Sequence, residues 1–171
     1  PDTYYGADPL RLELRVREDL SHFVQPKKDL GWPVLPSFFI EVKGPEGNAA
    51  VLKRQSVYDS VLTARRIQHL RTYYCDDEDE LFDGAAYVLC ATFNDGRLRF
   101  YATHVVRASN RNGMKNHHTE IMDFAIDNRQ DEFVKARAAM WNARQWTDDR
   151  RNEMIDAANA FRPAQGDQHG S

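Results

Sequence analysis

The sequence predicts an α/β fold with a central mixed sheet flanked by helices. Two observations lead to this class. Apolar strand patterns occur at 38–43 and 85–106, and long helical patterns occur at 49–74 and 130–161. Because helical and strand patterns alternate along the chain, we expect helices to cover a sheet rather than two sheets to pack together.

Length and composition favour one packed domain. The chain has 171 residues, of which 42% are hydrophobic, enough for a single core. We expect a domain over 1–161 and a flexible tail over 162–171, where Pro, Gly and Gln leave no apolar face.

The charge balance limits the classes of partner. Lys and Arg total 23 against 26 for Asp and Glu, a formal net charge of −3. This excludes a strongly basic nucleic-acid binder, so any such role must rest on local charge. No run approaches the roughly 20 apolar residues of a membrane span. Cys75 and Cys90 lie in dissimilar settings, so we expect an intracellular protein of the nucleus or cytoplasm, without a disulfide framework.

The first half of the chain predicts helix, loop, strand and helix. In the segment 9–25 the residues Leu10, Leu12, Leu14 and Val16 alternate as in a strand, but Leu12, Val16, Leu20 and Phe23 have helical spacing. Because Asp8-Pro9 can start a helix, a helix is preferred there. The proline-rich segment 26–36 predicts a loop, followed by the strand 37–43. An apolar stripe then predicts the helix 49–74.

The next segments predict an acidic loop and a hairpin. The run 76–80 has five acidic residues, typical of a solvated loop, although such a cluster can also bind cations. Strands at 85–93 and 97–106 flank Asn94-Asp95-Gly96, and Asp-Gly is a strong hairpin signal.

The last part predicts a loop and a long helix. Residues 108–118 are polar and Asn-rich and predict a loop, and 121–126 is either a short strand or a helix start. The helix 130–161 has an apolar stripe in which Trp141 and Trp146 are expected as core anchors. Thr147-Asp148-Asp149 can interrupt it by capping a second helix.

Two opposite charges stand out in the strand Ser37-Phe38-Phe39-Ile40-Glu41-Val42-Lys43. Glu41 and Lys43 alternate, so both side chains are expected to leave the same face of the sheet while Val42 points into the core. Burying charged side chains in an apolar strand costs free energy unless a partner or a ligand compensates the charge. A carboxylate, a lysine and one further Asp would suit Mg²⁺ and a neighbouring phosphate. The alternative is a structural ion pair at the strand end.

The chain resembles the PD-(D/E)xK nuclease superfamily, and more narrowly uncharacterised fungal proteins with a PD-(D/E)xK nuclease-like domain. The matching segments occur in order along nearly the whole chain. They are Pro1 to Gly6, the apolar-Glu-x-Lys strand 38–44, Gln55 on the following helix, the meander 85–106, and Trp141 to Trp146.

The resemblance implies a restriction-endonuclease-like core and assigns roles to four residues. Asp2 and Glu41 would bind Mg²⁺ or Mn²⁺, Lys43 would be the catalytic lysine, and Gln55 would orient the site. Asp29 is the alternative to Asp2, because it precedes Glu41 by 12 positions and Asp2 precedes it by 39. Superfamily members usually carry an acidic helix and a strand before this core, so we expect first elements of the fold to be missing here.

The helix after the strand concentrates positive charge. Between 53 and 71 it has five cationic residues against Asp59 alone, a balance of +4. Those expected to bind DNA or RNA are Lys53, Arg54, Arg65 and Arg66. The alternative is a solvated helix face that pairs with the acidic run 76–80.

Together these features lead us to expect a Mg²⁺-dependent nuclease-like domain that hydrolyses phosphodiester bonds. The alternative is a catalytically inactive module of the same fold that binds protein or nucleic acid, including as a secreted effector domain. An active site requires Asp2 or Asp29 close to Glu41 with Lys43 beside them.

Overall fold

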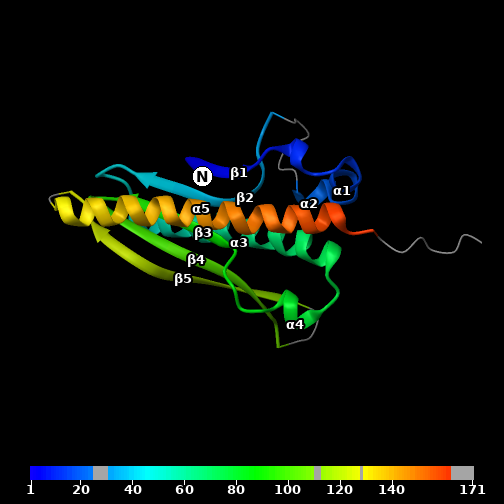
Figure 1. Ribbon diagram of the computed structural model, residues 1–171. Helices are drawn as coiled ribbons and strands as arrows, with labels where there is room; N and C mark the ends of the chain where they lie inside the picture. The colour runs from blue at the N-terminus through cyan, green and yellow to red at the C-terminus, as the bar shows by residue number, and fades with distance from the viewer. Residues whose placement is uncertain (25–30, 110–112, 128, 163–171) are drawn as a thin grey trace, which may run out of the picture.

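The computed structural model describes residues 1–24, 31–109, 113–127 and 129–162 and has an α/β architecture (Figure 1). The predicted α/β class is therefore confirmed. Five strands form one open, mixed sheet in the order β1-β2-β3-β4-β5. The elements in chain order are β1 (Thr3–Ala7), the 3₁₀ turn η1 (Pro9–Arg11), α1 (Leu14–Asp19), α2 (Ser21–Val24), β2 (Val34–Lys43), α3 (Ala49–Tyr74), α4 (Glu78–Leu81), β3 (Val88–Asn94), β4 (Arg97–Arg107), β5 (Met114–Ala125) and α5 (Gln130–Ala160).

The sheet has one parallel pair among antiparallel ones. β1 runs antiparallel to β2, whereas β2 and β3 are parallel and are joined through α3. β3, β4 and β5 follow as antiparallel neighbours. A parallel pair needs a long crossover, and α3 supplies it, which places the start of α3 directly after the end of β2.

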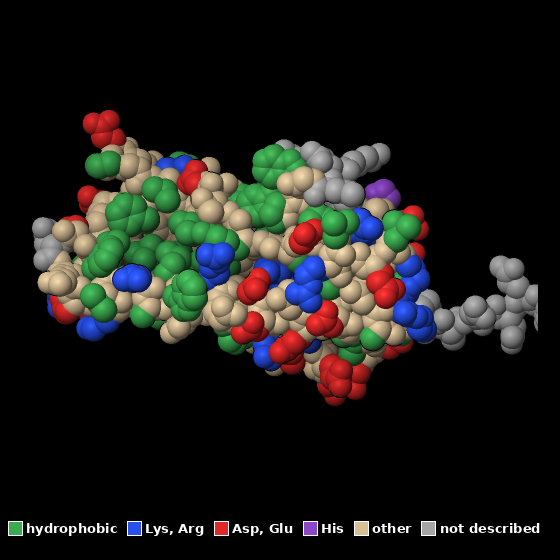
Figure 2. Space-filling model, turned by 45° about the horizontal axis from the view of Figure 1, so that its top comes forward, with side chains coloured by type: hydrophobic (Ala, Val, Ile, Leu, Met, Phe, Trp, Pro, Cys, Tyr) green, Lys and Arg blue, Asp and Glu red, His purple; other side chains and the backbone are tan. Residues whose placement is uncertain are grey.

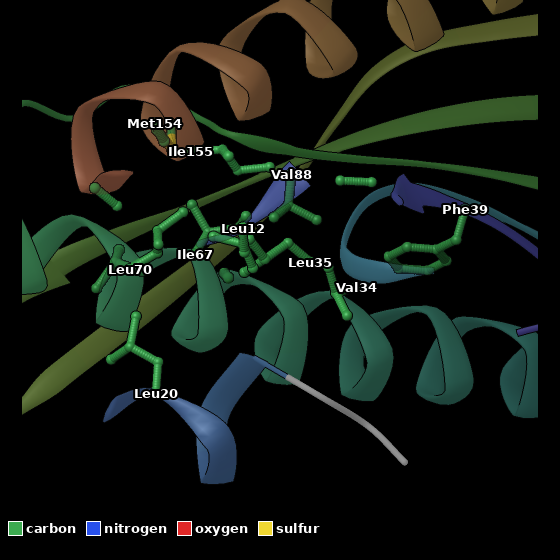
Figure 3. Packing of buried hydrophobic residues seen from close by; sticks show 14 of the residues in the cluster. Leu12, Leu20, Val34, Leu35, Phe39, Ile67, Leu70, Val88, Met154 and Ile155 are labelled. Atoms are coloured by element: carbon green, nitrogen blue, oxygen red, sulfur yellow. The ribbon is translucent and has the colours of Figure 1, made fainter. Parts of the chain in front are cut away.

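Side chains alternate between the two faces of the sheet and form two cores. Phe39 on β2 packs in a cluster with Ile67 and Leu70 of α3, and Ile155 of α5 joins the same cluster (Figure 3). Phe38 points the other way and packs with residues from the first half of α5. Odd-numbered residues of β2 from Phe39 onward therefore face α3.

The hairpin between β3 and β4 has the predicted turn. Asp95 and Gly96 both have positive φ, 48° and 70°, as a type I′ turn requires. Aspartate tolerates this left-handed conformation, and glycine adopts it without steric cost. A Cβ at position 96 would also lie 2.7 Å from the Asp127 side chain.

Substituting Gly96 with alanine is expected to reduce the free energy of unfolding by about 1–3 kcal/mol, because positive φ strains an alanine and the new methyl meets Asp127. Urea unfolding measures the change. The matched control is Gly44→Ala, where an added Cβ would meet nothing within 4 Å. An equal effect of both substitutions would contradict the turn geometry.

The N-terminal segment differs from the single helix expected over 9–25. Asp8 caps a 3₁₀ turn by accepting a hydrogen bond from Leu10 N at 2.8 Å, and two short helices follow. Segment 1–7, for which no element was expected, contains β1. The predicted loop 26–36 lies partly outside the described residues, and its end is wrong, because β2 begins at Val34.

Two further expectations of loops are wrong. β5 begins at Met114, inside the expected loop 108–118, because its polar residues pair with β4 at the edge of the sheet, where one side of the strand has no partner. The acidic run contains the short helix α4, capped by Asp77, whose carboxylate accepts a hydrogen bond from Asp79 N at 2.8 Å. Glu78 pairs with Arg107 of β4, whereas Arg71 of α3 donates to the backbone oxygen of Glu80.

α5 continues through Thr147 without the expected interruption, because the Thr147 hydroxyl donates to Ala143 O at 3.0 Å within the helix. Its first half leaves apolar side chains uncovered. Trp141 is 66% exposed, and Trp146, also exposed, stacks on Tyr87, so neither is a core anchor. Figure 2 shows a broad hydrophobic surface with basic side chains at the end where α5 begins. Among the described residues, no helix combines the length and apolar character of a membrane span.

Candidate nucleic-acid cleavage site

Glu41 is a buried carboxylate near the end of β2. It is 3% exposed, whereas Val42, which was expected to point into the core, is 43% exposed, so that expectation is wrong. Glu41 lies two residues after Phe39, on the face of the sheet that α3 covers. Its partner in the parallel ladder is Thr92 of β3, which is also buried. Its Oε1 atom is buried and lies 3.3 Å from the Pro1 nitrogen. A buried carboxylate costs free energy unless a positive charge or hydrogen bonds compensate it.

Asp59 of α3 is the side chain that meets Glu41. Burial raises the pKa of Glu41, and the nearby Asp59 carboxylate raises it further. The Pro1 nitrogen lies 3.3 Å from Glu41 Oε1 and 3.4 Å from Asp59 Oδ2, so both carboxylates approach one point. We call Glu41 and Asp59 the carboxylate pair.

Lys43 lies two residues after Glu41 on the same face of β2. Among the described residues it forms no ion pair with Glu41 or Asp59, and the following turn supports its side chain. Gly47 N donates to Gly44 O at 2.8 Å, closing the turn. A Cβ on Gly47 would lie 2.5 Å from Lys43 Cβ. Asn94 of β3 donates to Gly44 O at 3.3 Å and ties the turn to the sheet. The sequence therefore folds the chain closely over the stem of Lys43, which is half-buried.

The Asp2 carboxylate is held in place by a hydrogen bond to the backbone of β2. Its Oδ2 accepts a hydrogen bond from Val42 N at 2.7 Å, next to Glu41 in the chain. This bond holds the start of β1 against the end of β2, and it commits one oxygen of the carboxylate. The metal-binding role expected for Asp2 stays a prediction. Asp29, the alternative, lies outside the described residues.

Gln55 lies on the exposed side of α3, one helical turn before Asp59. Residues four apart share a helix face, so Gln55 lies on the same face of α3 as Asp59, one turn nearer the start of the helix. Its orienting role stays a prediction. Sequence reasoning missed Asp59 because it was counted only as one negative charge in a basic helix. Its spacing from Gln55 was the available signal.

The four basic residues expected to bind nucleic acid do not form one stripe. Lys53, Arg54 and Arg65 line the open, solvent-facing side of α3 around Tyr58. Arg66 lies on the side that carries Asp59, in a different pocket. The expected basic surface is thus three cations on the outer face of α3 and one beside the carboxylate pair.

The chemistry available at the site is that of oxygen ligands. Cys90 faces the same side, but burial raises the pKa of its thiol to about 12, so it stays protonated at neutral pH and is a poor metal ligand. Within the ranges that the structure describes, no three His, Cys, Asp or Glu side chains form a ready-made metal cluster. Mg²⁺ does not require one, because it is often held by one or two carboxylates, waters and substrate phosphates.

The raised pKa of Glu41 predicts a pH dependence for the metal-free protein. The folded-state value lies above the ordinary 4.5, so the folded state binds the proton more tightly than the unfolded state. Stability is therefore highest below the ordinary pKa and falls as pH rises through the raised one. Urea unfolding in EDTA should show this slope in wild type and a smaller one in Glu41→Gln.

The matched control for this pH series is Glu46→Gln, which changes an exposed glutamate in the neighbouring turn. It is expected to keep the wild-type slope. An unchanged slope in Glu41→Gln would contradict the burial of an ionisable Glu41.

Comparison of this chain with protein-family models, with curated proteins and with solved structures finds no match.

Proposed function

We propose that this chain is a metal-dependent nuclease-like domain of the PD-(D/E)xK type that hydrolyses phosphodiester bonds of nucleic acid. The observation that carries the proposal is the carboxylate pair, with Lys43 two residues after Glu41 on the same face of β2. A buried Glu41 with a second carboxylate close to it is costly for a structural domain. Such a pair can bind a metal cation, and the cation can in turn bind a phosphate.

The residues fit Mg²⁺ or Mn²⁺. The pair offers hard oxygen atoms, and Glu41 Oε1 and Asp59 Oδ2 lie 3.3 and 3.4 Å from the same Pro1 nitrogen, so a cation at that point meets both carboxylates. Glu41 and Asp59 would hold the ion, with Asp2 as the further ligand that the family resemblance suggests. When bound, the ion supplies Lewis acidity, which stabilises negative charge developing on the phosphate.

The other side chains have distinct tasks. The Lys43 ammonium binds a phosphate oxygen. Its Nζ either keeps its proton and acts through its positive charge, or exchanges a proton with the attacking water. Gln55 orients the water or phosphate from α3. Lys53, Arg54 and Arg65 attract the phosphate backbone along the outer face of α3.

The test is a cleavage assay with single-stranded DNA, duplex DNA and RNA, each with Mg²⁺, Mn²⁺ or EDTA. We expect cleavage with a metal and none in EDTA, and loss of cleavage in Glu41→Gln. If folded wild-type protein cuts none of the three substrates with either metal, the proposal is wrong.

One observation favours a second candidate, a non-catalytic binding module. The groove between α5 and the sheet has a volume of about 620 Å³ and is lined by Phe38, Phe133 and Trp141. Apolar grooves of this kind often mark protein contacts. Folded protein that neither binds nor cuts nucleic acid, but binds a protein partner more weakly after Trp141→Ala, would favour this candidate.

A further inference from the structure

A second pocket adjoins the carboxylate pair on the β1 side of α3. It has a volume of about 270 Å³, slightly below the range of about 300–1,000 Å³ typical of drug-sized ligands. Tyr4 and Trp32 provide aromatic walls, and Phe39 and Leu62 provide apolar surface. The pocket therefore suits one flat ring system rather than a peptide helix.

Two polar side chains in this pocket can orient a bound ligand. Asp59 belongs both to the carboxylate pair and to the pocket lining. Arg66 lines it as well, and burial lowers the pKa of its guanidinium, which shows that the group is partly removed from water. A ligand in the pocket thus meets an acceptor, a donor and two aromatic rings, and it lies next to the atoms that would bind metal.

A nucleobase has this chemistry. Its ring face stacks on Trp or Tyr, and its edge carries hydrogen-bond donors and acceptors. Base stacking on aromatic side chains does not depend strongly on sequence. A base within a duplex cannot enter without being unstacked and unpaired, at a cost of a few kcal/mol.

We infer that the pocket of Tyr4, Trp32, Asp59 and Arg66 receives one unstacked base of a single-stranded nucleic acid, next to the phosphate at the carboxylate pair. The inference rests on the proposed function and narrows its substrate class to single strands or unpaired ends. Continuity between the pocket and the pair through Asp59 is the observation that links them.

Binding of a fluorescently labelled single-stranded oligonucleotide and of its duplex, measured by anisotropy in EDTA, tests the inference. Wild type should bind the single strand at least about tenfold more tightly. Trp32→Ala should weaken single-strand binding about 5- to 150-fold, the loss of one stacked base, whereas Trp32→Phe should retain most of the affinity. The matched control is Trp141→Ala, a more exposed tryptophan in the groove between α5 and the sheet, and it should bind like wild type.

Tryptophan fluorescence gives a second measurement that does not depend on how well Trp32→Ala folds. The oligonucleotide should quench wild type and Trp141→Phe, and the quenching should be lost in Trp32→Phe. Equal binding of single strand and duplex, or quenching that persists in Trp32→Phe, would overturn the pocket assignment. Metal-dependent cleavage would then still support the proposed function. Wild-type protein that neither binds nor cuts any nucleic acid would overturn both.

Discussion

Lys43→Ala is expected to slow metal-dependent cleavage about 100- to 10,000-fold, the usual contribution of a positioned acid or base. Lys43 is half-buried at the end of β2, and only its stem packs under the turn at Gly47. Removing it should leave folding almost unchanged, so the loss would report on chemistry. The rate of cleavage at saturating Mg²⁺ and the melting temperature are the two measurements.

Two further variants help to interpret the result for Lys43→Ala. Lys135→Ala removes an exposed lysine on α5 that pairs with Asp131 and Glu132 and should cleave at the wild-type rate. Lys43→Arg keeps the positive charge but cannot give up a proton, so partial activity would assign an electrostatic role and full loss a proton-transfer role. Wild-type cleavage by Lys43→Ala would contradict the assigned site.

Arg151→Ala is expected to lower the free energy of unfolding by about 2–4 kcal/mol, because it removes a buried side chain and its hydrogen bonds. Arg151 of α5 is 3% exposed. Its Nη1 donates to Ser37 Oγ at 2.7 Å and to Tyr5 O at 3.4 Å, and its Nη2 pairs with Asp148. This one side chain therefore ties α5 to both β1 and β2.

The adjacent Arg150 provides the matched control for urea unfolding. Its pair with Glu153 is exposed, and exposed ion pairs contribute at most about 1 kcal/mol, so Arg150→Ala should change stability little. Similar stability of the two variants would show that the buried network of Arg151 does not hold the layers together.

The sequence predicted correctly the elements that are fixed by interactions between residues close together in the chain, such as turns and helix caps. The turn Asp95-Gly96 requires positive φ at both residues, and few residue pairs provide it, so the hairpin was predicted correctly. The helix 49–74 has its bounds confirmed, because Asn48 caps it by accepting hydrogen bonds from Ala50 N and Val51 N.

Elements that depend on partners far away in the chain could not be predicted. β1 is an edge strand that forms by pairing with β2, whose partner residues lie 27 to 37 positions later, from Ala7 with Val34 to Thr3 with Ile40. β5 includes polar residues such as Lys115 and Asn116 because it forms the other edge of the sheet, where apolar alternation is not required. For the same reason only one member of the carboxylate pair was predicted. Glu41 is recognisable in the sequence as a charge within an apolar strand. Asp59 comes close to Glu41 only when α3 packs on β2.

The central claim is that Glu41 and Asp59 bind a divalent cation. It is tested most directly by the melting temperature of wild type during titration with Mg²⁺ and Mn²⁺, since a ligand that binds only the folded state stabilises it by mass action. We expect a saturable rise in wild type, an unchanged response in Glu46→Gln, and no rise in Glu41→Gln or Asp59→Asn. A flat wild-type titration, or an equal rise in all four proteins, would contradict the claim.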